Sequence, residues 1–400
     1  MHEVYLCTPL RTPVGKYGGA LSSIRPDDMA ALVLRAVVER AGIDPAAIDD
    51  VIMGCANQAG EDNRNVARMA VLLAGFPHRV PAVTVNRLCA SSLEAVIVAA
   101  RAIRAGEADL IIAGGVESMS RAPYVLPKNV SGRASFGNLI AYDTALGWRF
   151  PNPAMEKLFP LETMGETAEN VAERYHISRD DQDAYALASH QRTLAAYADG
   201  FLQEEILPVT VRDEKGNTTT IERDEGPRPD TSLEKLAKLR PAFRPNGTVT
   251  AGNSSSLNDG AGALIVASEA AVKQHNLRPL ARYVAGHAAG VDPRLMGIGP
   301  VEAIPGALRK AGISIEEVDL FEINEAFAAQ VLACQRLLNI PLDRLNVFGG
   351  AIAIGHPLGM SGVRILGTLI RGLHRRGGRY GVASLCIGVG QGLAAVVERV

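Results

Sequence analysis

The 400-residue chain is predicted to be a layered α/β protein made of two similar halves, with a different segment inserted between them. Short, almost wholly apolar strands alternate with helices, which is typical of sheets covered on both faces. Matching motifs recur in the same order near the two ends of the chain. The stretch between them is rich in Gly, Pro and Asn and lacks that periodicity. Two such halves would pack their helix layers together, with the sheets outside.

Three pairs of segments carry the duplication. Each half contains a strand, a reactive residue, a helix, a glycine turn and a further strand. The pairs are 37–54 with 307–324, 85–96 with 353–363, and 110–117 with 383–390. The second pair aligns Cys89 with His356, so these residues are expected at equivalent places in two facing halves.

The inserted segment is expected to span residues 121–250. Thr163 and Glu166 have the spacing of a capping box at the start of a helix, and a second helix is expected from Ser178 to Gly200. Long insertions are often substrate-binding lids, although a solvated decoration is the alternative. The predicted domains are an N-terminal domain of 1–120 and 251–272, the inserted subdomain 121–250, and a C-terminal domain of 273–400.

Composition excludes several classes of protein. There are 41 basic and 43 acidic residues, so the net charge of -2 argues against a nucleic-acid partner. The five cysteines are widely spaced and form no CxxC motif, which disfavours a disulfide framework or a metal cluster and favours a reducing, cytoplasmic location. No secretory signal or membrane-spanning apolar run is visible.

Cys89 is the first candidate for chemistry. It follows an apolar strand and precedes a helix, where the helix dipole would favour its thiolate. The alternative is an inert buried cysteine, the usual state of a free Cys. His356 lies in a glycine-rich turn and could transfer protons, or be an ordinary turn histidine. A Cys–His pair is a common means of activating a thiol nucleophile.

Two further motifs follow strand ends. Cys386 enters a glycine-rich loop whose N–H groups, including that of Gly388, could form an oxyanion hole. The alternative is a strand-end cysteine before a tight turn. Asn324 could orient a water or an oxyanion, or simply cap a helix.

The chain resembles the thiolase family over its whole length. Several long motifs occur in the family's order. They are RTPVG (11–15), NRLCAS around Cys89, GGVESMS (114–120), TAGNSSSLNDGA (250–261), NEAF (324–327), GGAIAIGHPLGMSG (349–362) and CIGVGQG (386–392). The resemblance implies the thiolase fold, with two βαβαβαββ halves in an α/β/α/β/α arrangement and an inserted loop subdomain.

The resemblance also implies roles for these residues. Cys89 would be the acylated nucleophile, His356 its base and the activator of CoA, and Cys386 the second acid/base. The enolate would be stabilised by His356 and a water held by Asn324. The N–H groups of Cys89 and Gly388 would form a second oxyanion hole. CoA and acyl-CoA would be substrates, with no tightly bound cofactor and no metal.

CoA would lie on the inserted subdomain. By resemblance, Ser255 would contact the pantetheine arm and Arg228 the nucleotide end, while Met164, Met296 and Ala326 would line the tunnel. Ordinary core packing is the alternative for both methionines. The family implies a homodimer or homotetramer, with no membrane partner.

Within the family, residues 54–70 and 147–153 resemble the 3-oxoadipyl-CoA thiolases. That subgroup implies cleavage of 3-oxoadipyl-CoA with CoA to succinyl-CoA and acetyl-CoA, in the β-ketoadipate pathway of aromatic degradation. One of Arg64, Arg68 and Arg149 is expected to bind the distal carboxylate. Structural ion pairs or dimer contacts are the alternative for these arginines.

Three residues depart from the family pattern. Ser92 and Ser256 stand where glycine is usual, and Phe348 replaces the asparagine of Asn-Gly-Gly. Rival functions are a short-chain acetyl-CoA C-acetyltransferase, a broader 3-ketoacyl-CoA thiolase of fatty acid metabolism, and a catalytically weak acyl-CoA-binding scaffold. A NAD-dependent enzyme is disfavoured, because no strand leads into G-x-G-x-x-G.

Overall fold

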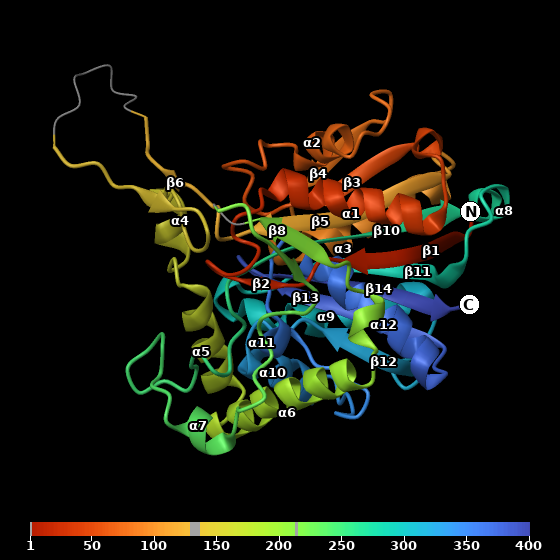
Figure 1. The fold of residues 1–400 in the computed structure, drawn as a ribbon. Coiled ribbons are helices and arrows are strands. Elements are labelled where there is room, and N and C mark those ends of the chain that lie inside the picture. The colour runs from red at the N-terminus through yellow and green to blue at the C-terminus, as the bar shows by residue number, and fades with distance from the viewer. Residues whose placement is uncertain (1, 129–136, 213–214) are drawn as a thin grey trace.

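The computed structural model describes residues 2–128, 137–212 and 215–400. The N-terminal half has the order βαβαβαββ (Figure 1). Its elements are β1 (Val4–Arg11), α1 (Pro26–Ala41), β3 (Asp50–Gly54), α2 (Val66–Leu73), β4 (Ala82–Val85), α3 (Ser91–Ala105), β5 (Leu110–Ser118) and β10 (Asn258–Ser268). The short strand β2 (Gly15–Lys16) pairs with β10, and α8 (Glu269–Gln274) leads into the second half.

The C-terminal half repeats this order with one strand reduced. Its elements are β11 (Pro279–Gly290), α9 (Gly299–Ala311), β12 (Val318–Ile323), α10 (Ala328–Leu337), α11 (Ala351–Ile354), α12 (Ser361–Arg376), β13 (Tyr380–Ile387) and β14 (Gln391–Arg399). The counterpart of β4 is a single parallel bridge between Phe321 and Leu345. The next residue, Asn346, has φ 47° and ends the pairing. Its side chain instead bonds both the N–H and the carbonyl of Ile323.

The helices form three layers with strands between them, as the expected five-layer order requires. Helices α3 and α12 lie in the middle and share one apolar core with strands of both halves. A second core joins α1 and α2 to the N-terminal strands, and a third joins α9 and α10 to the C-terminal strands. The α/β/α/β/α prediction is therefore confirmed.

The strands of the two halves form one continuous sheet rather than two separate sheets. Its order is β12-β13-β14-β11-β1-β10-β5-β3-β4, with β2 beside β10. The halves are joined by the antiparallel pairing of β1 with β11, where Leu6 lies opposite Ala281. Only β3–β4, β3–β5 and β12–β13 are parallel among the described pairs of this sheet. The sequence predicted the strands but not this junction.

The inserted residues form a helical layer and a projecting arm (Figure 1). The elements are β6 (Tyr124–Val125), β7 (Tyr142–Asp143), α4 (Pro153–Leu158), α5 (Met164–Arg174), α6 (Arg179–Ala198), β8 (Val209–Arg212), β9 (Thr218–Ile221) and α7 (Leu233–Ala237). The Thr163 capping box is present, and Ser178 caps α6, which ends two residues before Gly200. Among the described residues, no helix combines the length and apolar character needed to cross a bilayer. The three domain boundaries stay a prediction.

Candidate active site

Cys89 lies in a strained turn before α3. It is the middle residue of the 3₁₀ turn Leu88–Ala90, and Leu88 has φ 46°. A non-glycine residue in the left-handed region costs energy and is maintained only where its surroundings demand it. Here the Leu88 N–H donates to Asn86 Oδ1 at 2.8 Å, and the Ser91 hydroxyl donates to the Leu88 carbonyl at 2.7 Å. These bonds hold the turn of Cys89, a residue that is partly exposed as a whole although its thiol is desolvated.

The electrostatic environment of Cys89 differs from the sequence expectation. Burial is the largest effect, and it raises the pKa of the thiol to about 11. The N–H groups of Gly388 and of Cys89 itself lower the pKa, but by less. The expectation that a helix N-terminus would favour the thiolate is therefore wrong for the free protein, because desolvation of the charged form outweighs the local dipoles. The same two N–H groups match the predicted second oxyanion hole.

His356 is held by two contacts that leave one ring nitrogen free. Gly355, at φ 115°, allows the chain to pass so close to Asn258 that a Cβ there would lie 2.5 Å from its amide. The His356 N–H then donates to Asn258 Oδ1 at 2.9 Å. The imidazole Nδ1 lies 2.6 Å from the Ser361 hydroxyl, which is also 2.9 Å from the Pro357 carbonyl. Since a carbonyl can only accept, we assign the Ser361 hydroxyl as the donor to the Pro357 carbonyl. The hydroxyl oxygen then accepts a hydrogen bond from His356 Nδ1–H.

This assignment makes His356 Nε2 the basic nitrogen. Nε2 is buried and has no hydrogen-bond partner among the described residues. Burial, with a smaller effect of the Arg364 charge, lowers the pKa of His356 to about 3. The imidazole is therefore neutral at physiological pH, with a lone pair facing no protein donor.

Asn324 supplies a second free polar atom. Its N–H donates to the Ser384 carbonyl at 2.9 Å, which ties the end of β12 to β13. Arg364, on the first turn of α12, donates from Nη2 to Asn324 Oδ1 at 3.4 Å. Asn324 Nδ2 is buried without a partner in the part of the chain described. The bond to Oδ1 orients the amide so that its donor is the free end.

Cys386 lies near Cys89. It is only 1% exposed, on β13, which packs against the turn that carries Cys89. Burial raises the pKa of Cys386 well above its ordinary value, and the charge of Cys89 raises it further. The contacts between β13 and the turn of Cys89 place the two cysteines in neighbouring segments. Gly388 follows at the end of β13, and Val389 has φ 65°, a second strained residue beside the site.

The predicted tunnel residues come together around Cys386. Met296 and Ala326 form one apolar cluster with it, and the half-buried Met164 packs against that cluster. A Cβ at Gly388 would lie 3.3 Å from Met164 Sδ, so the loop and the methionine are in contact. Ser255 joins the same wall, because its N–H donates to the Ala326 carbonyl at 2.9 Å.

A cavity of about 420 Å³ lies on the inserted subdomain beside this wall. Arg228 lines it, together with Lys16, Lys235 and His190. The Arg228 N–H donates to His190 Nδ1 at 3.2 Å. Burial, which is the largest effect, and the Arg228 charge lower the pKa of His190 to about 4. Asp230 also lines the cavity and pairs with Lys235 at 2.7 Å. Three basic side chains against one acidic side chain leave a net basic lining, which suits a ligand with phosphate groups.

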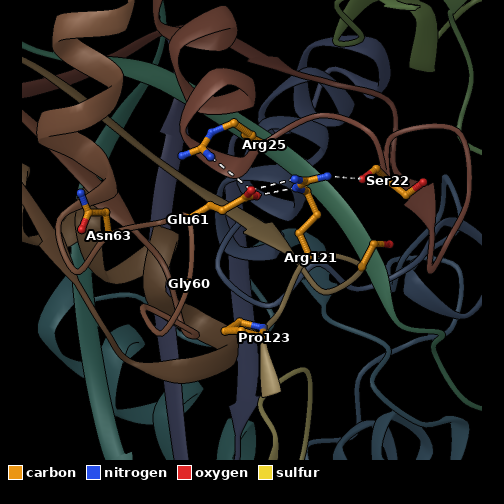
Figure 2. Close-up of a pocket in the computed structure, with 8 residues that line it drawn as sticks. Ser22, Arg25, Gly60, Glu61, Asn63, Arg121 and Pro123 are labelled. Carbon is orange, nitrogen blue, oxygen red and sulfur yellow. Dashed lines mark hydrogen bonds and ion pairs between the residues drawn. The ribbon is translucent and has the colours of Figure 1, made fainter. Parts of the chain in front are cut away.

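A second hollow, of about 580 Å³, is lined by Arg25, Glu61 and Arg121 (Figure 2). Its two arginines are neutralised by Glu61, which pairs with Arg25 at 3.1 Å and also with Arg121. Arg25 has a second acidic partner in Asp27. The charges of this hollow are thus balanced, and none of the predicted site residues lines it, whereas Arg228 lines the cavity described above.

Four positioning residues were not singled out from the sequence, although all but Arg364 lie within the quoted motifs. Ser361, Asn258 and Arg364 contact His356 or Asn324, as described above. The fourth is Glu117, whose buried carboxylate accepts the N–H groups of Ala56 at 3.0 Å, Asn57 at 3.1 Å and Gly359 at 2.8 Å. Burial raises the pKa of Glu117 to about 7. A polar residue inside a strand that is otherwise apolar was the available signal.

The three departures from the expected pattern have structural roles. Ser92 is fully buried, and its hydroxyl accepts the Val363 N–H at 2.9 Å, a donor whose other bond, to the Met360 carbonyl, is 3.2 Å long. The Ser256 hydroxyl donates to Asn258 Oδ1 at 2.9 Å. Phe348 stacks on Phe201 of the insert with ring centroids 3.8 Å apart. None of these contacts removes a group from the site.

Within residues 2–128, 137–212 and 215–400, no group of three or more His, Cys, Asp and Glu side chains is arranged to hold a metal ion. The five cysteines are free.

Comparison with known proteins covers the whole chain. Residues 4–270 match the family described as thiolase, N-terminal domain, and residues 277–399 match thiolase, C-terminal domain. The chain is 56% identical over 403 residues to a 3-oxoadipyl-CoA/3-oxo-5,6-dehydrosuberyl-CoA thiolase of Escherichia coli (strain K12), with all of both chains covered. It is 56% identical over 402 residues to a beta-ketoadipyl-CoA thiolase of Pseudomonas aeruginosa, covering 100% and 99% of the two chains. Human mitochondrial 3-ketoacyl-CoA thiolase in complex with CoA superimposes with a TM-score of 0.92 at 43% identity, covering 100% and 98%.

Proposed function

Because the chain belongs to the thiolase family, we propose that it cleaves 3-oxoadipyl-CoA with CoA to give succinyl-CoA and acetyl-CoA. As a thiolase it is an acyltransferase acting on CoA thioesters, which are substrates rather than resident cofactors. The full-length identity of 56% to a relative named for 3-oxoadipyl-CoA carries the choice of substrate. That substrate corresponds to the β-ketoadipate pathway, as expected from residues 54–70 and 147–153.

The first half-reaction begins at Cys89. Its sulfur attacks the 3-keto carbon while its proton passes to His356 Nε2, and the N–H groups of Cys89 and Gly388 hold the resulting alkoxide. Collapse breaks the C2–C3 bond and sends its electrons into the thioester enolate of acetyl-CoA. Cys386 protonates that enolate, acetyl-CoA leaves, and the proton on His356 restores the Cys386 thiol. A succinyl group remains on Cys89.

The second half-reaction returns the nucleophile. The thiol of free CoA gives its proton to His356 Nε2 and attacks the succinyl carbonyl. The Cys89 thiolate leaves and takes the proton back from His356, so the protein ends unchanged. An acyl-enzyme that separates the two halves predicts ping-pong kinetics.

The unpartnered polar atoms support this assignment. His356 Nε2 and Asn324 Nδ2 are both buried without partners in the described chain. A buried polar group without a partner costs about 1–3 kcal/mol, so two of them at one site favour a ligand that satisfies both. After Nε2 takes the thiol proton it becomes a donor. We assign it, with a water held by Asn324, to the enolate oxygen, where preorganised donors stabilise developing charge.

The pKa values of the free protein favour a concerted proton transfer. Burial raises the pKa of Cys89 to about 11 and lowers that of His356 to about 3, so the resting pair is thiol and neutral imidazole. Desolvation disfavours both charged forms. We propose that the proton moves as the sulfur–carbon bond forms, and that the N–H groups of Gly388 and Cys89 stabilise the oxyanion that results.

CoA is assigned to the cavity of about 420 Å³. Arg228, with Lys16 and Lys235, would face its phosphates, and Ser255 would contact the pantetheine arm beside Ala326. Met164, Met296 and Ala326 would line the path to Cys386. The basic charge and the adjoining apolar cluster support this orientation.

We infer a cytoplasmic homodimer or homotetramer. The five free cysteines support a reducing compartment. The edge strand β4 is half exposed, with Val83 42% exposed, and the neighbouring Leu72 and Leu73 of α2 are also exposed. An open edge beside apolar side chains favours pairing with a second copy. Light scattering after size-exclusion chromatography tests this, and a monomer at micromolar concentration would refute it.

The decisive experiment for the reaction is thiolysis of three substrates. The rates with 3-oxoadipyl-CoA, 3-oxohexanoyl-CoA and acetoacetyl-CoA are compared, and intact-mass spectrometry records the acyl group on Cys89. We expect the highest kcat/KM for 3-oxoadipyl-CoA and a succinyl adduct that is absent from Cys89→Ala. Faster turnover of acetoacetyl-CoA would identify a short-chain acetyltransferase, and faster 3-oxohexanoyl-CoA turnover a broader thiolase. CoA binding without any adduct would identify a scaffold.

A further inference from the structure

The three arginines considered for the distal carboxylate have different surroundings. Arg68 donates from Nη1 to the Val80 carbonyl at 2.6 Å and from Nη2 to the His78 carbonyl at 2.9 Å. Both terminal nitrogens of the Arg68 guanidinium are thus hydrogen-bonded to the loop before β4, which connects α2 to that loop. Arg64 is exposed, as is Arg149, but it lies in a turn at φ 64° and has no hydrogen bond to the catalytic loops in the described chain.

Arg149 instead holds the segment next to the catalytic loops. It donates from Nη2 to the Asn57 carbonyl at 2.9 Å and from Nη1 to Asn57 Oδ1 at 3.4 Å. The preceding residue, Ala56, accepts a bond at 3.0 Å from Asn86, the side chain that holds the turn of Cys89. Three hydrogen bonds, from Arg149 to Asn57, from Asn86 to Ala56 and from Leu88 to Asn86, therefore connect Arg149 to the turn of the nucleophile.

The same segment also contacts the histidine loop. Glu117 collects the N–H groups of Ala56, Asn57 and Gly359, and Gly359 lies three residues after His356. The fit is close, because a Cβ at Gly115 would lie 2.0 Å from the Gly359 carbonyl oxygen. Residues 56–57 are therefore held beside both catalytic loops by hydrogen bonds, and Arg149 is bonded to this segment.

The charge of Arg149 is available. Both of its recorded bonds go to uncharged oxygens, and no carboxylate in the described part of the chain pairs with it. Other arginines near this region are neutralised: Arg87 pairs with Glu94 at 3.0 Å, and Arg121 pairs with Glu61. A guanidinium carries five donors in a planar fork, so the donors not used on Asn57 remain for a ligand.

We propose that Arg149 pairs with the terminal carboxylate of the acyl chain and so selects dicarboxylic 3-oxoacyl-CoA substrates. This rests on the proposed function. The acyl group is covalently attached at Cys89, and the carboxylate of a 3-oxoadipyl chain lies three bonds beyond the carbon that is attacked. Planar guanidinium groups bind carboxylates through two parallel hydrogen bonds. A neutral chain of the same length would leave the charge of Arg149 unpaired, which provides the discrimination.

The test replaces Arg149 with Gln and with Lys and compares 3-oxoadipyl-CoA with 3-oxohexanoyl-CoA. The two substrates have the same chain length and differ in a terminal carboxylate against a methyl group. Gln can still donate to the Asn57 carbonyl, so Arg149→Gln removes the charge while keeping a hydrogen bond to Asn57. Arg68→Gln is the matched control, because it removes an arginine whose bonds only fasten α2.

We expect Arg149→Gln to lower kcat/KM for 3-oxoadipyl-CoA by about 10- to 100-fold, mainly through KM, as for loss of a charge-assisted pair worth about 1.5–3 kcal/mol. The loss with 3-oxohexanoyl-CoA should be far smaller. Arg149→Lys should recover part of the preference. The KM of the unaltered protein for 3-oxoadipyl-CoA should rise with salt, and this dependence should weaken in Arg149→Gln.

Equal losses with both substrates in Arg149→Gln would show that Arg149 only holds Asn57, and the proposal would be overturned. A retained preference for 3-oxoadipyl-CoA, or an equal change of preference in Arg68→Gln, would also overturn it. If the unaltered protein itself prefers 3-oxohexanoyl-CoA, the proposed function fails, which is a distinct result from the failure of Arg149 alone.

Discussion

Replacing Ser361 with Ala removes the contact that sets the tautomer of His356. The Ser361 hydroxyl lies 2.6 Å from Nδ1, and both residues are buried. Without it, Nδ1 has no recorded acceptor. The ring is then free to carry its hydrogen on Nε2 instead, the nitrogen that must accept the proton of Cys89. The expected effect is therefore on the rate of acyl transfer rather than on CoA binding.

The size of the effect follows from the burial of His356, which is 5% exposed. Leaving one buried donor unsatisfied costs about 1–3 kcal/mol. At about 1.36 kcal/mol for each factor of ten, kcat should fall by roughly 5- to 150-fold. KM for CoA should change little, because Ser361 is not among the residues lining the cavity of Arg228.

The assay is steady-state thiolysis at pH 7–8, accompanied by thermal unfolding. Ser92→Ala is the matched control. Ser92 belongs to α3, and its hydroxyl contacts the first turn of α12 through the Val363 N–H but does not contact His356. Ser361→Thr should retain most activity, because it keeps the hydroxyl. A kcat for Ser361→Ala within about two-fold of the unaltered protein would refute the tautomer assignment. An equal loss in Ser92→Ala would show that loosening of α12 is responsible.

Three other predictions concern charge and packing. Alkylation of Cys89 by iodoacetamide, measured against Cys89→Ala, should rise about tenfold per pH unit from pH 7 to 9, because its pKa is about 11; a plateau near pH 7 would contradict this. His190 has its pKa lowered to about 4 from 6.5, so its contribution to stability is complete above pH 6.5 and is lost as pH falls toward 4. Between pH 7 and 5 the unaltered protein should lose about 2 kcal/mol more unfolding free energy than His190→Asn, measured by urea denaturation; parallel losses would disprove it. Phe348→Asn should lower the unfolding free energy by about 2 kcal/mol through loss of the stack on Phe201, with kcat within two-fold, and a large drop in kcat would show that the ring supports the histidine loop.

Much of the site could be predicted from the chain because the duplication is visible in the sequence. Aligning Cys89 with His356 placed both residues before helices, and the structure has them directly before α3 and α12, which share one core. The glycine-rich loops also indicated close approach of backbone. Gly355 passes Asn258 at a distance that excludes a side chain.

Residues that act through other residues were harder to find. Ser361 and Arg364 are three positions apart on α12, so they share a face, yet only the fold shows that one reaches His356 and the other Asn324. Glu117 accepts the N–H of Gly359, which lies 242 residues further along the chain. No local sequence pattern predicts a contact between residues so far apart in the chain, because such contacts depend on how the two halves pack.

The sequence by itself determined the two similar halves, the layered fold, the family and the candidates for the reactive residues, because periodicity and motif order are properties of neighbouring positions. Tertiary structure decided how the halves join through β1 and β11, which nitrogen of His356 is free, and the protonation state of Cys89. The physical reason is desolvation and long-range contact. The pKa of a thiol depends on all the protein that surrounds it, and helix position alone led to the opposite sign.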